Sequence, residues 1–134
     1  MKLCPPKMPQ VVTQMDMPAR LEELAELKEG WLDGKGQALD PSGLTWLFTS
    51  FETLYDSALP LPYLYPTVEG SIQAEWTLGE WEISLEIVLL QKRADYHALN
   101  LVSNECRETN LDLSAPEGWQ ELSEALKVLS SGGA

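Results

Sequence analysis

The clearest pattern in the chain is a strict alternation of apolar and polar residues on both sides of Gly79-Glu80. A period of two is typical of strands that bury one face, and a glycine at the start of a two-residue loop favours a type II′ turn. Residues 71–88 are therefore predicted to form an antiparallel hairpin. The expected pairs on its apolar face are Leu78 with Trp81, Trp76 with Ile83, Ala74 with Leu85 and Ile72 with Ile87.

The polar face of the same hairpin is expected to pair Thr77 with Glu82, Glu75 with Ser84 and Gln73 with Glu86. This register gathers Glu75, Glu82 and Glu86 on one side of the sheet. Carboxylates on adjacent strands act as acid and base in some hydrolases, provided that a cleft raises the pKa of one of them. The sequence indicates no such cleft, so a solvated polar face is the simpler interpretation and no catalytic residue is predicted.

Three other segments show the three-to-four-residue spacing of apolar residues that is typical of amphipathic helices. The first is predicted over residues 17–29, with Asp16 as its N-cap and Gly30 at its end. The second is expected to begin at Asp40, and the third follows a capping-box signature over residues 114–117. Their apolar stripes are Leu21, Leu24 and Leu27; Leu44, Leu47, Phe48, Phe51, Leu54 and Tyr55; and Trp119, Leu122, Leu126 and Leu129.

Weaker alternation predicts a third strand over residues 96–102, after a turn that includes Lys92, Arg93 and Asp95, and a fourth strand over about 106–111. These elements predict an α+β fold in two layers. A mainly antiparallel sheet, made of the hairpin and one or two further strands, would carry about three helices on one face.

The whole chain, residues 1–134, is expected to be a single domain, since no linker or internal repeat divides it. The proline-rich residues 1–12 predict an extended or loose arm, and residues 130–134 predict a frayed tail.

Acidic residues outnumber basic ones, with 21 Asp and Glu against nine Lys and Arg and a formal net charge of −12. A field of this sign repels phosphate backbones and anionic lipids, so neither direct nucleic-acid binding nor membrane binding is expected. It favours a basic protein partner, or a nucleic-acid-binding protein whose channel an acidic surface would occupy. An acidic surface that only keeps the protein soluble is the alternative explanation.

The cysteines and the single histidine show no metal-binding or catalytic spacing. Cys4 and Cys106 are interpreted as free thiols, and His97 as a structural or surface residue. No metal ion and no cofactor is predicted, and all three residues are expected to be dispensable. The leader lacks a continuous apolar stretch and no apolar run reaches the length of a membrane span, which favours a cytoplasmic location.

Large aromatic residues are the candidate anchors for a partner. Trp46 falls off the apolar stripe of the second helix, so either a loop covers it or a partner binds it. Tyr63 and Tyr65 lie in an extended segment that leads to a turn at Glu69-Gly70. Trp31 is expected to pin a glycine-rich loop, residues 30–36, to the core; phosphate binding is disfavoured because the loop follows a helix and lacks a Gly-Lys-Ser/Thr ending.

A resemblance covers about residues 21–89. The Gly-Trp-x-x-Gly-x-Gly loop that begins at Gly30, and the segment from Pro66-Thr67 through Gly70 to Glu75-Trp76, resemble a family of small uncharacterised bacterial proteins. Those proteins share a Trp-Asp-Gly-like loop and a Pro-Thr-x-x-Gly-Gly-x-x-x-Glu-Trp segment. This chain departs from the pattern at Leu32, inserted in the loop, and at Ser71, where a second glycine is usual. The resemblance implies a fold and a bacterial origin, and no particular activity.

Two classes of function follow from the sequence. The first is a non-catalytic acidic binding module, such as an antitoxin-like or inhibitory subunit, that contacts a basic partner through Trp46, Tyr63, Tyr65 and the three glutamates of the hairpin. The second is a small enzyme or small-ligand-binding domain that uses the Trp31 loop and the same glutamates.

Overall fold

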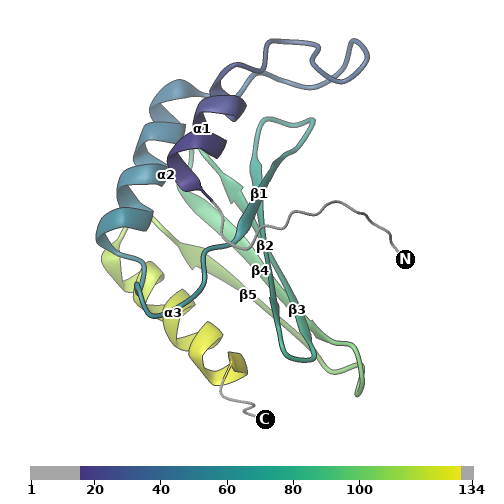
Figure 1. Ribbon diagram of the computed structural model, residues 1–134, viewed down its shortest axis with the longest axis vertical. Helices are drawn as coiled ribbons and strands as arrows, with labels where there is room; N and C mark the ends of the chain where they lie inside the picture. The colour runs from purple at the N-terminus through teal and green to yellow at the C-terminus, as the bar shows by residue number, and fades with distance from the viewer. Residues whose placement is uncertain (1–15, 131–134) are drawn as a thin grey trace.

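The computed structural model describes residues 16–130 (Figure 1). The predicted arm over residues 1–12, Cys4 and residues 131–134 of the predicted tail lie outside this range. In chain order the elements are α1 (Met17–Ala25), α2 (Pro41–Thr53), β1 (Tyr63–Pro66), β2 (Ile72–Leu78), β3 (Trp81–Val88), β4 (Arg93–Asn100), β5 (Cys106–Asp112) and α3 (Pro116–Ser130).

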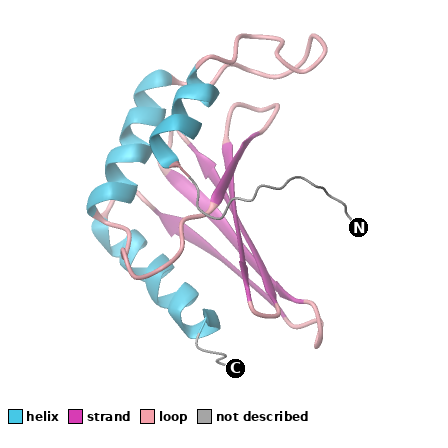
Figure 2. Cartoon of the chain, in the orientation of Figure 1, coloured by secondary structure: helices cyan, strands magenta, loops and turns pink. Residues whose placement is uncertain are grey.

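The five strands form one open antiparallel sheet in the order β1-β2-β3-β4-β5. The three described helices lie on one side of it, so within residues 16–130 the opposite face of the sheet is uncovered (Figure 2). The predicted two-layer α+β fold is thus confirmed. The sheet contains one strand more than expected, because the extended segment that includes Tyr63 and Tyr65 pairs with β2 as the edge strand β1.

The predicted hairpin is confirmed residue by residue. Trp76 pairs with Ile83 and both are buried, and the other expected pairs on both faces are present in the same register. Gly79 has a φ of +60°, as the first position of a type II′ turn requires. The apolar faces of β2 and β3 therefore form the floor on which the helices pack.

Several predicted boundaries are wrong. The third predicted strand ends at Asn100 and not at residue 102. The first helix ends at Ala25 and not at residue 29, because the N–H groups of Glu26 and Leu27 bond three residues back, which tightens the last turn and ends the helix. The turn between β3 and β4 spans only residues 89–92. Arg93 and Asp95, expected in that turn, extend the ladder instead by pairing with Val88 and Glu86.

The third helix joins the sheet through a close backbone contact. The Ser114 hydroxyl, predicted to cap the third helix, instead donates a hydrogen bond to Asp112 Oδ1 at 2.5 Å. Helix α3 begins at Pro116. Gly118 lies directly against the backbone of Asp112. The predicted stripe of α3 is buried, and Trp119 packs edge-on against Phe51 of α2 with ring centroids 5.0 Å apart. One hydrophobic cluster thus joins all three helices to the sheet.

Candidate functional site

The uncovered face of the sheet holds most of the residues that the sequence singles out. Glu75 of β2 pairs with Ser84 of β3, and Glu82 and Glu86 stand two residues before and after Ser84. Diagonal neighbours of this kind lie about 7–8 Å apart, so the three carboxylates form one group on this face. The register thus brings them together as predicted.

Each of these carboxylates accepts a hydrogen bond from a different neighbour. Glu75 accepts from Gln73 at 2.6 Å and Glu82 accepts from Thr77 at 3.0 Å. Glu86 accepts from Ser71 at 2.9 Å. Because each carboxylate has its own neutral donor, the arrangement fixes three negative charges on the surface. Within the described residues, no hydrogen bond joins two of these three carboxylates.

Further acidic residues extend this surface across β4 and β5. The strand registers place Asp95, Glu108 and Asp112 on the same face as the three glutamates. The basic residues that share the face in the described strands are Arg93 and His97. We call this surface the acidic sheet face, defined by Glu75, Glu82, Glu86, Asp95, Glu108 and Asp112.

Two tyrosines border the acidic sheet face on the edge strand β1. Tyr63 pairs with Glu75 and is 48% exposed, and Tyr65 pairs with Gln73 and is 44% exposed. Partial burial, followed by the nearby charge of Glu75, raises the pKa of Tyr65 above its usual value, so this ring stays neutral at physiological pH. The two rings therefore offer apolar surface beside the carboxylates.

The free edge of β1 is poorly suited to strand addition. Arg20 of α1 donates its Nε–H to the Leu64 carbonyl at 2.9 Å, and Pro66 has no N–H to donate. A partner at this end of the sheet would consequently contact side chains of the face rather than the backbone of the edge.

Trp46 lies apart from the other candidate anchors. It is half-buried in the helix layer, where its ring packs edge-on against Trp119 with centroids 6.4 Å apart. The Lys92 ammonium lies 5.7 Å from the same ring. Packing in the helix layer thus accounts for much of the burial of Trp46. The aromatic residues beside the acidic sheet face are Tyr63 and Tyr65.

The Trp31 loop is closed on itself. The indole N–H of Trp31 donates to the Gln37 carbonyl at 3.0 Å, and its ring covers Gly36 so closely that an added Cβ there would lie 2.7 Å from it. The prediction that Trp31 packs on the core is therefore wrong, since its half-buried ring packs on its own loop. Gly30, Gly34 and Gly36 all have positive φ values, which glycine adopts readily.

This loop touches the turn between β1 and β2. The Gln37 N–H donates to the Val68 carbonyl at 2.9 Å, and the Gln37 side chain lies against Gly70. The two segments that carry the family resemblance thus meet at one end of the molecule. Close contacts and positive φ values account for the glycines in these two segments. The ring of Trp31 packs on its own loop.

A small apolar cavity of about 430 Å³ lies in the helix layer. Its walls include Met17 of α1, Phe48 and Phe51 of α2, and Leu59 and Leu61 of the segment that follows. Asp16, Glu52, Tyr55 and Ser57 also line it, so the cavity combines apolar walls with a few polar groups, as small-ligand pockets do.

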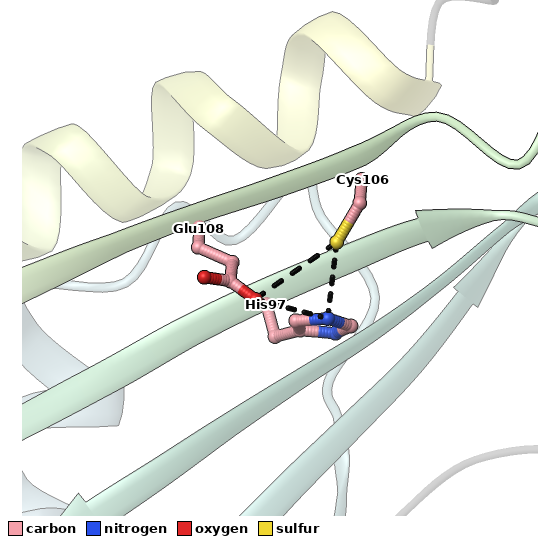
Figure 3. A group of neighbouring side chains, drawn as sticks. All are labelled: His97, Cys106 and Glu108. Atoms are coloured by element: carbon pink, nitrogen blue, oxygen red, sulfur yellow. Dashed lines mark hydrogen bonds and ion pairs between the residues drawn. The ribbon is translucent and has the colours of Figure 1, made fainter.

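A cluster that the sequence analysis did not predict lies on the uncovered face at β4 and β5 (Figure 3). Cys106 Sγ is 3.2 Å from His97 Nε2, Glu108 Oε2 is 3.5 Å from the same nitrogen, and the sulfur and the carboxylate oxygen are 3.9 Å apart. Both neighbours approach Nε2. In a nucleophilic triad the acid would instead orient the histidine through its other nitrogen, so the cluster is not arranged as one.

The fold thus brings together Cys106 and His97, which show no metal-binding or catalytic spacing in the sequence. Glu108 pairs directly with His97, and Cys106 is two residues from Glu108 on the same strand, so all three side chains leave one face. The Cys-x-Glu spacing in a strand is the sequence signal for this cluster, and the register between β4 and β5 adds His97 to it.

Comparisons of the chain with family models, with curated proteins and with solved structures find no match. The family resemblance stays a prediction. Among the described helices, none has the length and apolar character needed to cross a membrane.

Proposed function

We propose that this protein is a non-catalytic binding module whose acidic sheet face docks a basic protein partner. The observation that carries the proposal is the concentration of carboxylates beside two half-exposed tyrosines on a sheet face that none of the described helices covers. A partner that is itself a nucleic-acid-binding protein fits this charge, and the module would then act as an antitoxin-like or inhibitory subunit in the cytoplasm.

The two kinds of residue have different expected roles. Exposed charges at the border of an interface mainly raise the association rate and select the sign of the partner. Affinity comes from large side chains that lose water on binding, and tyrosine is among the commonest residues in this role. Tyr63 and Tyr65 supply such surface at one border of the acidic sheet face.

The test begins with capture of partners from the source organism by the wild-type protein and by a variant with Glu75, Glu82 and Glu86 changed to Gln. The matched control changes Glu117, Glu121 and Glu124 of α3 to Gln, on the helix layer. Each variant changes the net charge from −12 to −9, because each loses three negative charges. Only the position of the lost charge differs between them.

A true partner is expected to associate several-fold more slowly with the sheet-face variant at low salt, and at the wild-type rate with the α3 control. Raising the salt to physiological strength, where the screening length is about 8 Å, should reduce the wild-type rate. Changing Tyr63 or Tyr65 to Ala should weaken affinity by about 30-fold, the effect of a residue that contributes about 2 kcal/mol.

Three results would contradict the proposal. They are a partner set that is identical for all three proteins, an association rate that does not respond to salt, and equal slowing by the two triple variants. Each would indicate that the acidic residues serve only to solvate the surface.

A further inference from the structure

We propose that His97, Cys106 and Glu108 bind a zinc ion on the uncovered face of the sheet. This inference does not depend on the proposed partner, since it concerns three side chains of this chain and an inorganic ion. It rests on the distances between the ligand atoms, on the donor types and on the rigidity of the strands that carry them.

The distances match those of a metal site. In tetrahedral zinc coordination, with bonds of about 2.3 Å to sulfur and about 2.0–2.1 Å to nitrogen and oxygen, neighbouring ligand atoms lie about 3.4–3.6 Å apart. The three separations in the cluster are 3.2 Å for sulfur to nitrogen, 3.5 Å for nitrogen to oxygen and 3.9 Å for sulfur to oxygen. Shifts of a few tenths of an ångström, within the reach of side-chain rotation, would make all three equal to the coordination distances.

The donor set favours zinc over the alkaline-earth ions. Calcium and magnesium take oxygen ligands, whereas a thiolate and an imidazole suit the softer Zn²⁺. Binding would release the Cys106 thiol proton to solvent, because the metal takes the thiolate. Three protein ligands leave a fourth position, and since all three side chains are exposed, that position faces solvent.

The sheet holds the ligands in place before any ion arrives. His97 and Glu108 are directly paired residues of adjacent strands, and Cys106 pairs with Leu99, the next residue of β4 on that face. The ladder between β4 and β5 extends over seven residue pairs, from Leu99 with Cys106 to Arg93 with Asp112. A site on two paired strands loses little backbone freedom on binding, which favours affinity.

The competing explanation is a hydrogen-bonded group of thiol, imidazole and carboxylate that binds no ion. Binding experiments separate the two. All proteins would carry Cys4→Ser, so that Cys106 is the only thiol, and would be freed of metal before titration with Zn²⁺ and, separately, with Co²⁺. The variants are Cys106→Ser, His97→Gln and Glu108→Gln, and the matched control is Glu82→Gln on the same face.

We expect one Zn²⁺ per chain, retained in the presence of excess Mg²⁺, and a Co²⁺ complex with a thiolate-to-cobalt charge-transfer band and the visible bands of a tetrahedral site. Loss of a group that only supports a metal ligand typically weakens metal affinity by about 10–100-fold, so each ligand variant should weaken it by at least about tenfold. The Glu82→Gln control should bind as the parent protein does. Circular dichroism would show that each variant keeps the fold.

Three results would overturn the proposal: no zinc binding, zinc affinity that Cys106→Ser leaves unchanged, or a cobalt spectrum without the charge-transfer band. The second and third would assign any bound metal to scattered carboxylates. Because these measurements need no partner, their failure would leave the proposed docking function untouched, and failure to find a partner would leave the zinc site untouched.

Discussion

Replacing Gly118 with alanine is expected to destabilise the protein, although the same change in an exposed helix stabilises it by about 1 kcal/mol. A Cβ at Gly118 would lie 2.0 Å from the Asp112 carbonyl oxygen and 2.7 Å from its carbonyl carbon. Both are backbone atoms, so no side chain can rotate away. Helix α3 or the end of β5 would have to move.

The cost follows from what holds that backbone. The Leu113 N–H donates to the Lys92 carbonyl at 2.9 Å, and the Leu113 carbonyl accepts from the Trp119 indole at 2.9 Å. Overpacking at the upper end of its usual range costs about 3 kcal/mol, and weakening one of these bonds costs about 1 kcal/mol. After subtracting about 1 kcal/mol for helix propensity, the expected net loss is about 3 kcal/mol of unfolding free energy.

Ser123 supplies a control in the same helix. Its hydroxyl is buried and has no hydrogen-bond partner in the described part of the chain. Ser123→Ala removes that group and improves helix propensity, so it should stabilise the protein by about 1 kcal/mol. Helix propensity alone predicts that both alanines stabilise; the packing argument predicts opposite signs.

Unfolding in guanidinium chloride, followed by tryptophan fluorescence, measures both changes. The slope of free energy against denaturant should be the same for all three proteins, so that midpoints report stability. A Gly118→Ala protein as stable as the wild type would refute the reasoning, because it would mean that α3 does not approach the backbone of β5 as described.

Two further predictions concern pH. Burial raises the pKa of Tyr55 to about 12 from its ordinary value of 10.0. The unfolded chain therefore loses this proton first, so stability should fall as the pH rises between these values, and Tyr55→Phe should remove that part of the fall in alkaline unfolding curves. The hydrogen bond from Lys127 at 2.5 Å lowers the pKa of Asp56 below its ordinary value of 3.8. The pair should stabilise at neutral pH and lose this effect as the pH falls below that value, so the stabilities of wild type and Asp56→Asn should converge in acid.

The hairpin was predictable because every level of the sequence agreed on it. Alternation sets which side chains face the helices, and the two-residue turn at Gly79-Glu80 sets the register, so the pattern alone places the three glutamates on one face. The edge strand β1 was only partly predictable. Four residues ending in a proline show too little alternation to distinguish a paired strand from an extended connection.

The cluster of His97, Cys106 and Glu108 was out of reach of the same reasoning because the turn between β4 and β5 is irregular. Five residues, 101–105, separate β4 from β5, and Asn104 adopts a left-handed φ of +65° within them. A one-residue error in that loop would move Cys106 and Glu108 to the buried face, away from His97. The sequence contained the three ligands and their alternation, and lacked the register that brings them to one point.

The docking proposal and the zinc proposal concern the same face of the sheet, and the dependence of association on charge distinguishes between them. Zinc would bring two positive charges and displace one thiol proton, which changes the net charge by +1, from −12 to −11. This shift is too small to remove the attraction of the acidic sheet face for a basic partner. Salt-dependent association should therefore persist with or without zinc. If association instead required zinc and ignored salt, the partner would be a ligand for the open fourth position, and Tyr63 and the hairpin glutamates would not control it.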